Sequence, residues 1–151
     1  MSPSENLSRL GLTLPPVATP AGAYVPARRS GNLVFTAGQV PLVDGKVART
    51  GKVGADVSAE DAYDLARICT LNALAAVDGL VGLDSVAGVV KVVGFVASSP
   101  DFTGQPGVIN GASDLLGEVF GEAGQHARSA VGVAVLPLDV PVEVELVVEV
   151  D

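Results

Sequence analysis

The chain has 151 residues, of which 48% are hydrophobic and 17% are charged, and its formal net charge is −8. This length is typical of a single domain with one core. The shortage of lysine and arginine opposes binding to a phosphate backbone, so no nucleic acid partner is expected. The one cysteine, Cys69, excludes an intramolecular disulfide and a thiolate metal centre, and the acidic residues lack metal-binding spacing.

The first twenty residues are polar and then rich in proline. They contain neither a basic region followed by a long apolar run nor the ~20 apolar residues of a membrane span. We therefore expect a soluble, unprocessed protein of the reducing cytoplasm, without membrane contact. Because charged residues are few, part of the surface is expected to be buried against copies of the same chain.

The N-terminal third predicts an arm, a hairpin and a loop. A short helical turn is expected in Ser2–Leu12, after which three prolines favour an extended segment, so that residues 1–20 form an arm. Strand-forming residues in Tyr24–Arg28 and Asn32–Val40 flank a polar turn and predict a hairpin. The glycine-rich stretch 44–54 predicts a loop with a short edge strand.

The middle of the chain predicts two helices around a strand. Ser58 followed by Asp61 is typical of a helix N-cap, and apolar residues then recur every three or four positions until Gly82. The apolar, valine-rich stretch Val86–Ala97 predicts a strand covered on both faces. A second helix is expected over Val108–Phe120, where the apolar residues again follow helical spacing.

The segment from His126 to Val150 predicts two strands. They are joined by Leu136–Pro141, whose prolines and aspartate favour a turn, so a β-hairpin is expected. Arg128 lies at the start of the first strand. In the second strand, valine and leucine alternate with glutamate, so that Glu143 and two later glutamates share one face. An arginine beside such carboxylates is suited to binding an acidic substrate.

The order strand, strand, helix, strand, helix, strand, strand predicts an α+β fold in a single domain of residues 1–151. Two helices would cover one face of a mixed β-sheet. The other face must then be buried by oligomerisation, and small residues that alternate with valine after Arg128 support such close packing. A closed ring is the simplest assembly.

A set of short motifs, taken in their order along the chain, resembles the reactive intermediate deaminase (Rid) family, which is also called YjgF and, in older usage, endoribonuclease L-PSP. The resemblance covers most of the chain from Ala21 to Val150, and the ordered set of motifs carries it. The motifs are Ala23–Val25, Gly31–Pro41, Val90–Val96, Asp101–Phe102, Asn110, Ala127–Ser129, Leu136–Pro137 and Val142–Glu145.

The resemblance implies a chorismate-mutase-like fold of the bacillus type and a homotrimer with a central β-barrel and pockets at the subunit interfaces. Family members of the deaminase type hydrolyse 2-imino acids, or their enamine tautomers, to 2-keto acids and ammonia without a cofactor. By the same resemblance, Arg128 would bind the substrate carboxylate and Glu143 would lie near the hydrolytic water. Tyr24, Gly38 and Asn110 would line the same pocket.

Two positions depart from the family pattern. Ala37 stands where the family commonly has serine before the Gly-Gln pair, and Ala130 stands where it commonly has cysteine. These changes remove a hydroxyl and a thiol from the expected pocket wall, so they bear on substrate choice and on activity.

Each candidate residue also has a structural interpretation. Arg128 would then form a salt bridge with Glu143 or Glu145, and the glutamates would occupy a solvated strand face. Tyr24 would be a packing residue with a hydrated hydroxyl, and Asn110 would cap its own helix.

Two further residues are interpreted as structural. His126 is expected to be an exposed loop residue, because the chain has no nucleophile-elbow motif for it to serve. Cys69 lies on the apolar face of its helix and is expected in the core.

These residues support two functional hypotheses. The first is an enzyme that deaminates small 2-imino acids, with Arg128 holding the carboxylate, backbone groups near Gly38 holding the imine, and Glu143 activating water. The alternative is a protein without catalytic activity that senses a small carboxylate metabolite in the same pocket, which the alanines at 37 and 130 favour. Ribonuclease activity is disfavoured by the acidic charge and the single histidine.

Overall fold

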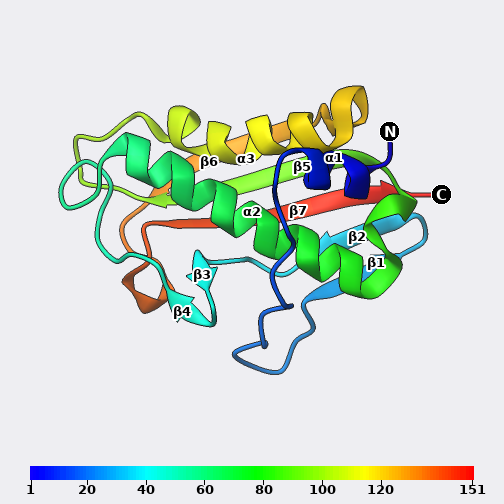
Figure 1. Cartoon of the computed structure of the whole chain (residues 1–151). Coiled ribbons are helices and arrows are strands. Elements are labelled where there is room, and N and C mark those ends of the chain that lie inside the picture. The colour runs from blue at the N-terminus through cyan, green and yellow to red at the C-terminus, as the bar shows by residue number, and fades with distance from the viewer.

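The computed structural model describes residues 1–151. It is built on one five-stranded sheet with the strand order β1-β2-β7-β5-β6, and Figure 1 shows two long helices lying across one face of it. All neighbouring strands are antiparallel except β5 and β6, which are parallel. The strands are β1 (Ala27–Ser30), β2 (Leu33–Thr36), β5 (Val86–Ala97), β6 (Ala127–Val133) and β7 (Val142–Val150).

Helices α2 and α3 cover the sheet, and the remaining elements are short. The Ser58 side chain accepts a hydrogen bond from the Asp61 amide at the start of α2, as the capping pattern predicts. The helices are α1 (Pro3–Arg9), α2 (Ala59–Val81) and α3 (Gln105–Phe120). The 3₁₀ turns are η1 (Leu83–Ser85), η2 (Gly121–Gly124) and η3 (Pro137–Asp139). Two further short strands, β3 (Leu42–Val43) and β4 (Lys46–Val47), pair with each other.

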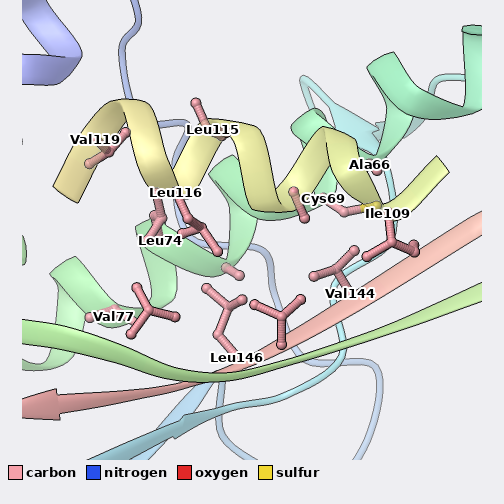
Figure 2. Packing of buried hydrophobic residues seen from close by; sticks show 14 of the residues in the cluster. Ala66, Cys69, Leu74, Val77, Ile109, Leu115, Leu116, Val119, Val144 and Leu146 are labelled. Atoms are coloured by element: carbon pink, nitrogen blue, oxygen red, sulfur yellow. The ribbon is translucent and has the colours of Figure 1, made fainter. Parts of the chain in front are cut away.

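The hydrophobic core lies between the two helices and the sheet. Figure 2 shows Leu74 of α2 and Leu116 of α3 directed toward Leu146 of β7. The predicted alternation in β7 is confirmed, because its apolar residues at even positions are buried while Glu143 and Glu145 are only half-buried. Cys69 is fully buried among these side chains, also as predicted.

The predicted hairpin of β6 and β7 is wrong. Strand β5 lies between them, pairing with β6 on one side and with β7 on the other. Helix α3 carries the chain back to the starting end of β5, so that β6 runs parallel to β5. Strand β7 then fills the place between β2 and β5, where both of its edges are paired and its valine face packs against the helices.

Two boundaries differ from the sequence-based expectation. The first hairpin uses Ala27–Ser30 and Leu33–Thr36, because Gly31 takes the left-handed conformation (φ 60°) that a tight turn requires. Helix α3 begins at Gln105 rather than Val108, since Pro106 sits in the first turn, where a missing N–H costs nothing.

The N-terminal arm contains the expected helix and docks on the helical layer. Leu7 of α1 is buried, and the Asn6 amide donates a hydrogen bond to the Val119 carbonyl at 2.8 Å. The Ser4 hydroxyl donates to Asp84 at 2.6 Å. Beyond α1 the chain runs past the proline segment toward β1.

The face of the sheet away from the helices is uncovered in the single chain. The expectation that β5 is covered on both faces therefore fails for one isolated copy. Exposed apolar side chains on or beside this face include Phe35, Val90 and Val131. No helix in the chain combines the length and the apolar character that crossing a membrane requires.

Candidate functional site

The predicted site residues fall into two groups, one on each face of the sheet. The first group surrounds Glu143 in a cleft of about 550 Å³, whose lining also includes Tyr24 and Gly38. The second group surrounds Arg128 and includes Asn110. One group presents a carboxylate and the other a guanidinium.

The position of Glu143 is fixed by a backbone bridge between its neighbour and the segment after β2. The Gln39 amide donates to the Val144 carbonyl at 2.8 Å, and the Val144 amide donates to the Gln39 carbonyl at 3.0 Å. This pairing places Gly38 directly against the Glu143 side chain. A Cβ atom at Gly38 would lie 3.0 Å from the Glu143 carboxyl carbon and closer still to one carboxylate oxygen. Glycine is therefore required for the observed Glu143 rotamer.

The Glu143 carboxyl group has the character of a base. Burial raises the pKa of Glu143 above its ordinary value, and the neighbouring Glu145 carboxylate raises the same pKa further. None of the three ion pairs in the chain, Arg49–Asp61, Lys52–Asp139 and Arg67–Glu118, involves Glu143. An unpaired carboxylate with a raised pKa in a cleft is a stronger base than an ordinary glutamate and is suited to accepting a proton from water.

The end of the N-terminal arm forms one wall of the cleft. Residues 18–21 and Tyr24 line it, and the Tyr24 hydroxyl accepts a hydrogen bond from the Ala21 amide at 3.0 Å. Tyr24 is 51% exposed, which is more than the structural interpretation of Tyr24 as a packing residue leads one to expect. Its hydroxyl still has a proton to donate to a ligand.

The opposite rim is the η3 turn between β6 and β7. Leu138 and Asp139 both have positive φ angles, 62° and 56°, although neither is glycine. The Asp139 carbonyl accepts a hydrogen bond from the Gly51 amide at 2.9 Å, and its carboxylate pairs with Lys52. These contacts hold an unfavourable backbone conformation and keep Leu138 at the edge of the cleft.

The Arg128 group joins β6 to α3. One guanidinium nitrogen of Arg128, Nη1, donates to Asn110 Oδ1 at 2.7 Å and to Ser113 Oγ at 3.2 Å. Nη2 and Nε are left for a ligand. Asn110 is the sixth residue of α3 and does not cap it, so the capping interpretation is wrong.

His126 belongs to the same group. It is half-buried rather than exposed, which corrects the expectation of an exposed loop residue. Its Nε2 atom lies 2.9 Å from Ser113 Oγ and its Nδ1 atom 2.6 Å from the Gly124 carbonyl oxygen.

The two groups do not meet within one chain. Arg128 is the cross-strand partner of Val92, which in turn pairs with Leu146. Paired residues of neighbouring strands share a face of the sheet, so Arg128 points to the face that the helices cover. Glu143 is opposite Phe95 and points to the other face. The structure therefore contains no salt bridge from Arg128 to Glu143 or Glu145.

Sequence reasoning missed Ser113, His126 and Leu138. A signal was present for the first two, because His126 is two residues before Arg128, immediately ahead of β6, and Ser113 is three residues after Asn110 on α3. These spacings place each pair on a common face. The expected pocket departures, Ala37 and Ala130, are both half-buried, and Ala130 packs against the core.

The cleft contains no candidate metal centre. No group of three or more histidine, cysteine, aspartate or glutamate side chains in the chain is arranged to hold a metal ion. The cysteine is buried 3.6 Å from the Val142 carbonyl oxygen, and burial raises the pKa of the Cys69 thiol well above its ordinary value. Cys69 is therefore a core residue rather than a nucleophile.

Comparison with known proteins gives consistent matches along the whole chain. Protein TCP17 of Trypanosoma cruzi is 46% identical over 148 residues, which cover 97% of this chain and 92% of the relative. The 2-iminobutanoate/2-iminopropanoate deaminase of Escherichia coli is 34% identical over 128 residues, covering 83% of this chain and 86% of the enzyme.

Solved structures agree with these matches. The crystal structure of Atu1372 from Agrobacterium tumefaciens superposes with a TM-score of 0.91 at 45% identity, covering 99% of this chain and 92% of that one. The structure of E. coli TdcF with bound serine superposes with a TM-score of 0.67 at 26% identity, covering 89% and 94%. The family model described as "YjgF/chorismate_mutase-like, putative endoribonuclease" matches residues 4–150. The chain therefore belongs to the YjgF/chorismate mutase-like family.

Proposed function

We propose that the protein hydrolyses small, reactive 2-imino acids or their enamine tautomers to 2-keto acids and ammonia, without a cofactor. The observation that carries this proposal is the Glu143 carboxylate, which is half-buried, free of ion pairs and packed against the exposed backbone of Gly38. Relatives at modest identity are named 2-iminobutanoate/2-iminopropanoate deaminase and reactive intermediate deaminase, which supports the same chemistry.

The complete site would lie between two subunits. Arg128 and Glu143 are on opposite faces of one sheet, so one ligand reaches both only if a second copy supplies one of them. The uncovered apolar face of the sheet supports self-association, and the family resemblance favours a homotrimer in which three sheets form a central β-barrel. Arg128 and Asn110 of one subunit would then face Tyr24, Gly38 and Glu143 of its neighbour.

In this site the guanidinium of Arg128 would bind the substrate carboxylate through Nη2 and Nε, which the contacts to Asn110 and Ser113 leave free. This contact orients the adjacent C=N carbon toward Glu143. The exposed Gly38 backbone beside it would contact the imine nitrogen or the tetrahedral adduct.

The reaction balances with water alone. Glu143 would take a proton from water as the oxygen bonds to the C=N carbon, and would return that proton to the nitrogen, giving a carbinolamine. Glu143 would then move the hydroxyl proton to the nitrogen as the C–N bond breaks and the C=O bond forms. One water is consumed, ammonia leaves, and the carboxylate is regenerated.

Ammonia release tests this proposal. Purified protein mixed with freshly generated 2-iminobutanoate should accelerate ammonia release, and Glu143→Gln should lower turnover by ~100-fold because the amide cannot act as a base. Calorimetric binding of 2-oxobutanoate should change little in the same variant. Equal turnover in both proteins would remove Glu143 from the mechanism.

A second candidate function is the sensing of a small carboxylate metabolite, without turnover. The observation in its favour is that Ala37 and Ala130 carry no hydroxyl or thiol at the two positions where the family resemblance would place such groups. A sensor would bind 2-oxobutanoate saturably while ammonia release stayed at the uncatalysed rate in wild type and variant alike. For either function, we propose that the protein acts on small metabolic acids in the cytoplasm.

A further inference from the structure

The geometry points to Ser113 and His126 as positioning residues that hold Arg128 in its carboxylate-binding orientation through a directed chain of hydrogen bonds. This inference rests on the proposed function, since it concerns the residue proposed to bind the substrate. Neither side chain would touch the substrate. Both would act through the guanidinium.

The chain of hydrogen bonds begins at the backbone of the η2 turn. The Gly124 carbonyl oxygen can only accept a hydrogen bond, so His126 Nδ1, 2.6 Å away, carries the proton. In the neutral imidazole, Nε2 is then an acceptor. The Ser113 hydroxyl, 2.9 Å away, donates its single proton to it. The Gly124 carbonyl oxygen therefore determines which atom donates and which accepts at each step as far as Ser113.

The last link reaches the guanidinium. Because the Ser113 proton is committed to His126, the Ser113 oxygen presents its lone pairs to Arg128 Nη1 at 3.2 Å. Asn110 Oδ1 accepts a second hydrogen bond from the same nitrogen at 2.7 Å. Two acceptors on one nitrogen fix the plane of the guanidinium, so the unused Nη2 and Nε point in one direction. Each atom that links the network, from the Gly124 carbonyl oxygen to Arg128 Nη1, therefore has a partner of the matching kind.

The surroundings favour this function over a purely structural one. Ser113 and His126 are both half-buried, and the network ends on an arginine that makes no ion pair within the chain. By contrast, Arg67 is paired with the carboxylate of Glu118 on the neighbouring surface of α2 and α3. Here the charge at its end is left for a ligand.

Substitution of the middle link tests the inference. Ser113→Ala should weaken 2-oxobutanoate binding by about tenfold, since a hydrogen bond to a charged group is lost, and should raise KM for 2-iminobutanoate with little change in kcat. Ser113→Thr keeps the hydroxyl and should restore affinity. Gln125→Ala changes an exposed neighbour of His126 and serves as the matched control.

Nuclear magnetic resonance supplies a readout independent of catalysis. The chain has one histidine, so its imidazole ¹⁵N signals belong to His126 without assignment. The wild type should show the Nδ1–H tautomer, with an Nε2 chemical shift that changes when Ser113→Ala removes its hydrogen-bond donor.

Substitutions of the histidine give a further test by ligand affinity. His126→Gln, whose side-chain oxygen can still accept a hydrogen bond from Ser113, should keep more affinity for 2-oxobutanoate than His126→Leu.

The outcomes separate this inference from the proposed function. If Arg128→Ala abolishes 2-oxobutanoate binding while Ser113→Ala and His126→Leu bind as the wild type does, the positioning role is overturned. If Arg128→Ala itself binds 2-oxobutanoate normally, the proposed function fails and the inference fails with it. A well-folded Ser113→Ala protein with lower affinity, rescued by threonine, supports the inference.

Discussion

The Cα atom of Gly38 lies against the side chain of Glu143, so that a methyl group at this position would collide with the carboxylate. The contact joins the segment after β2 to the start of β7, which are far apart in the sequence and are linked by the Gln39–Val144 backbone bridge. The glycine thus gives the carboxylate its place and leaves the adjacent backbone open to a ligand.

Gly38→Ala should displace the Glu143 carboxylate and lower ammonia release from 2-iminobutanoate by ~10-fold or more, because misplacing a general base removes its contribution. The circular dichroism spectrum should be unchanged. Gly107→Ala is the matched control, since a Cβ atom there meets nothing within 4 Å. If Gly38→Ala retains full turnover, the position of Glu143 is not important for the reaction.

The pH dependence should reflect the raised pKa of Glu143. Turnover should fall on acidification through that raised pKa, because the protonated carboxyl group cannot accept a proton from water. The acidic limb of the kcat/KM profile should therefore lie above the pH at which an ordinary glutamate titrates. A profile that stays flat down to the ordinary glutamate range would contradict this assignment.

The same pKa affects stability with the opposite sign from an ordinary paired carboxylate. Because the folded state binds the Glu143 proton more tightly than the unfolded state, the stabilising contribution is present below the unfolded pKa. It is lost as pH rises through the folded pKa. Glu143→Gln should remove this loss, so the variant should gain stability relative to wild type at neutral pH. Urea denaturation at several pH values measures the difference.

Arg128→Lys should weaken 2-oxobutanoate binding while the protein stays folded. Lysine keeps the charge but loses the planar fork, and it cannot bond Asn110 and Ser113 while also presenting two donors to a ligand. A loss of about tenfold in affinity, measured by calorimetry, is expected. Arg67→Lys, at a partly exposed surface ion pair with Glu118, should bind normally. Unfolding or dissociation of Arg128→Lys with intact affinity would mean that the arginine is structural.

Val131→Asp should dissociate the proposed trimer. Val131 is 44% exposed on the uncovered face of the sheet, so a charge there is tolerated by a single chain but is costly in an apolar interface. Sedimentation at micromolar concentration should show a trimer for the wild type and a smaller species for the variant. A stable monomeric wild type would contradict both the assembly and the shared site.

Leu138→Asn should stabilise the protein by about 1 kcal/mol, because asparagine adopts the left-handed conformation at lower cost than leucine. The leucine is largely exposed, so little burial is lost. Val135→Asn, at an equally exposed position without positive φ, should not stabilise. If the denaturation midpoint of Leu138→Asn is unchanged or lower, the η3 turn stores no strain.

Local patterns in the sequence were sufficient for several elements. The Ser58 cap, the bounds of the Val86–Ala97 strand and the buried valine face of β7 follow from capping chemistry and from two- and 3.6-residue periods. The family was also identifiable from its ordered motifs, because such motifs are contiguous in sequence. Each of these features depends on residues close together in the chain.

Strand partners and faces were decided only by the tertiary structure. The hairpin expected from Leu136–Pro141 did not form, because β7 is buried on both edges between β2 and β5 while β6 gains a parallel partner through α3. A turn-like sequence specifies where a strand ends but not which strand it pairs with. Long-range burial makes that choice.

The same limit applies to the site. The sequence placed Arg128 and Glu143 together, because they precede and follow one expected turn, whereas the sheet separates them onto opposite faces. The contacts of Ser113 and His126 with the Arg128 group depend on the packing of α3 on β6, because their hydrogen bonds connect different elements. Periodicity along the sequence determined which residues share a face of one element, and packing between elements determined which faces meet.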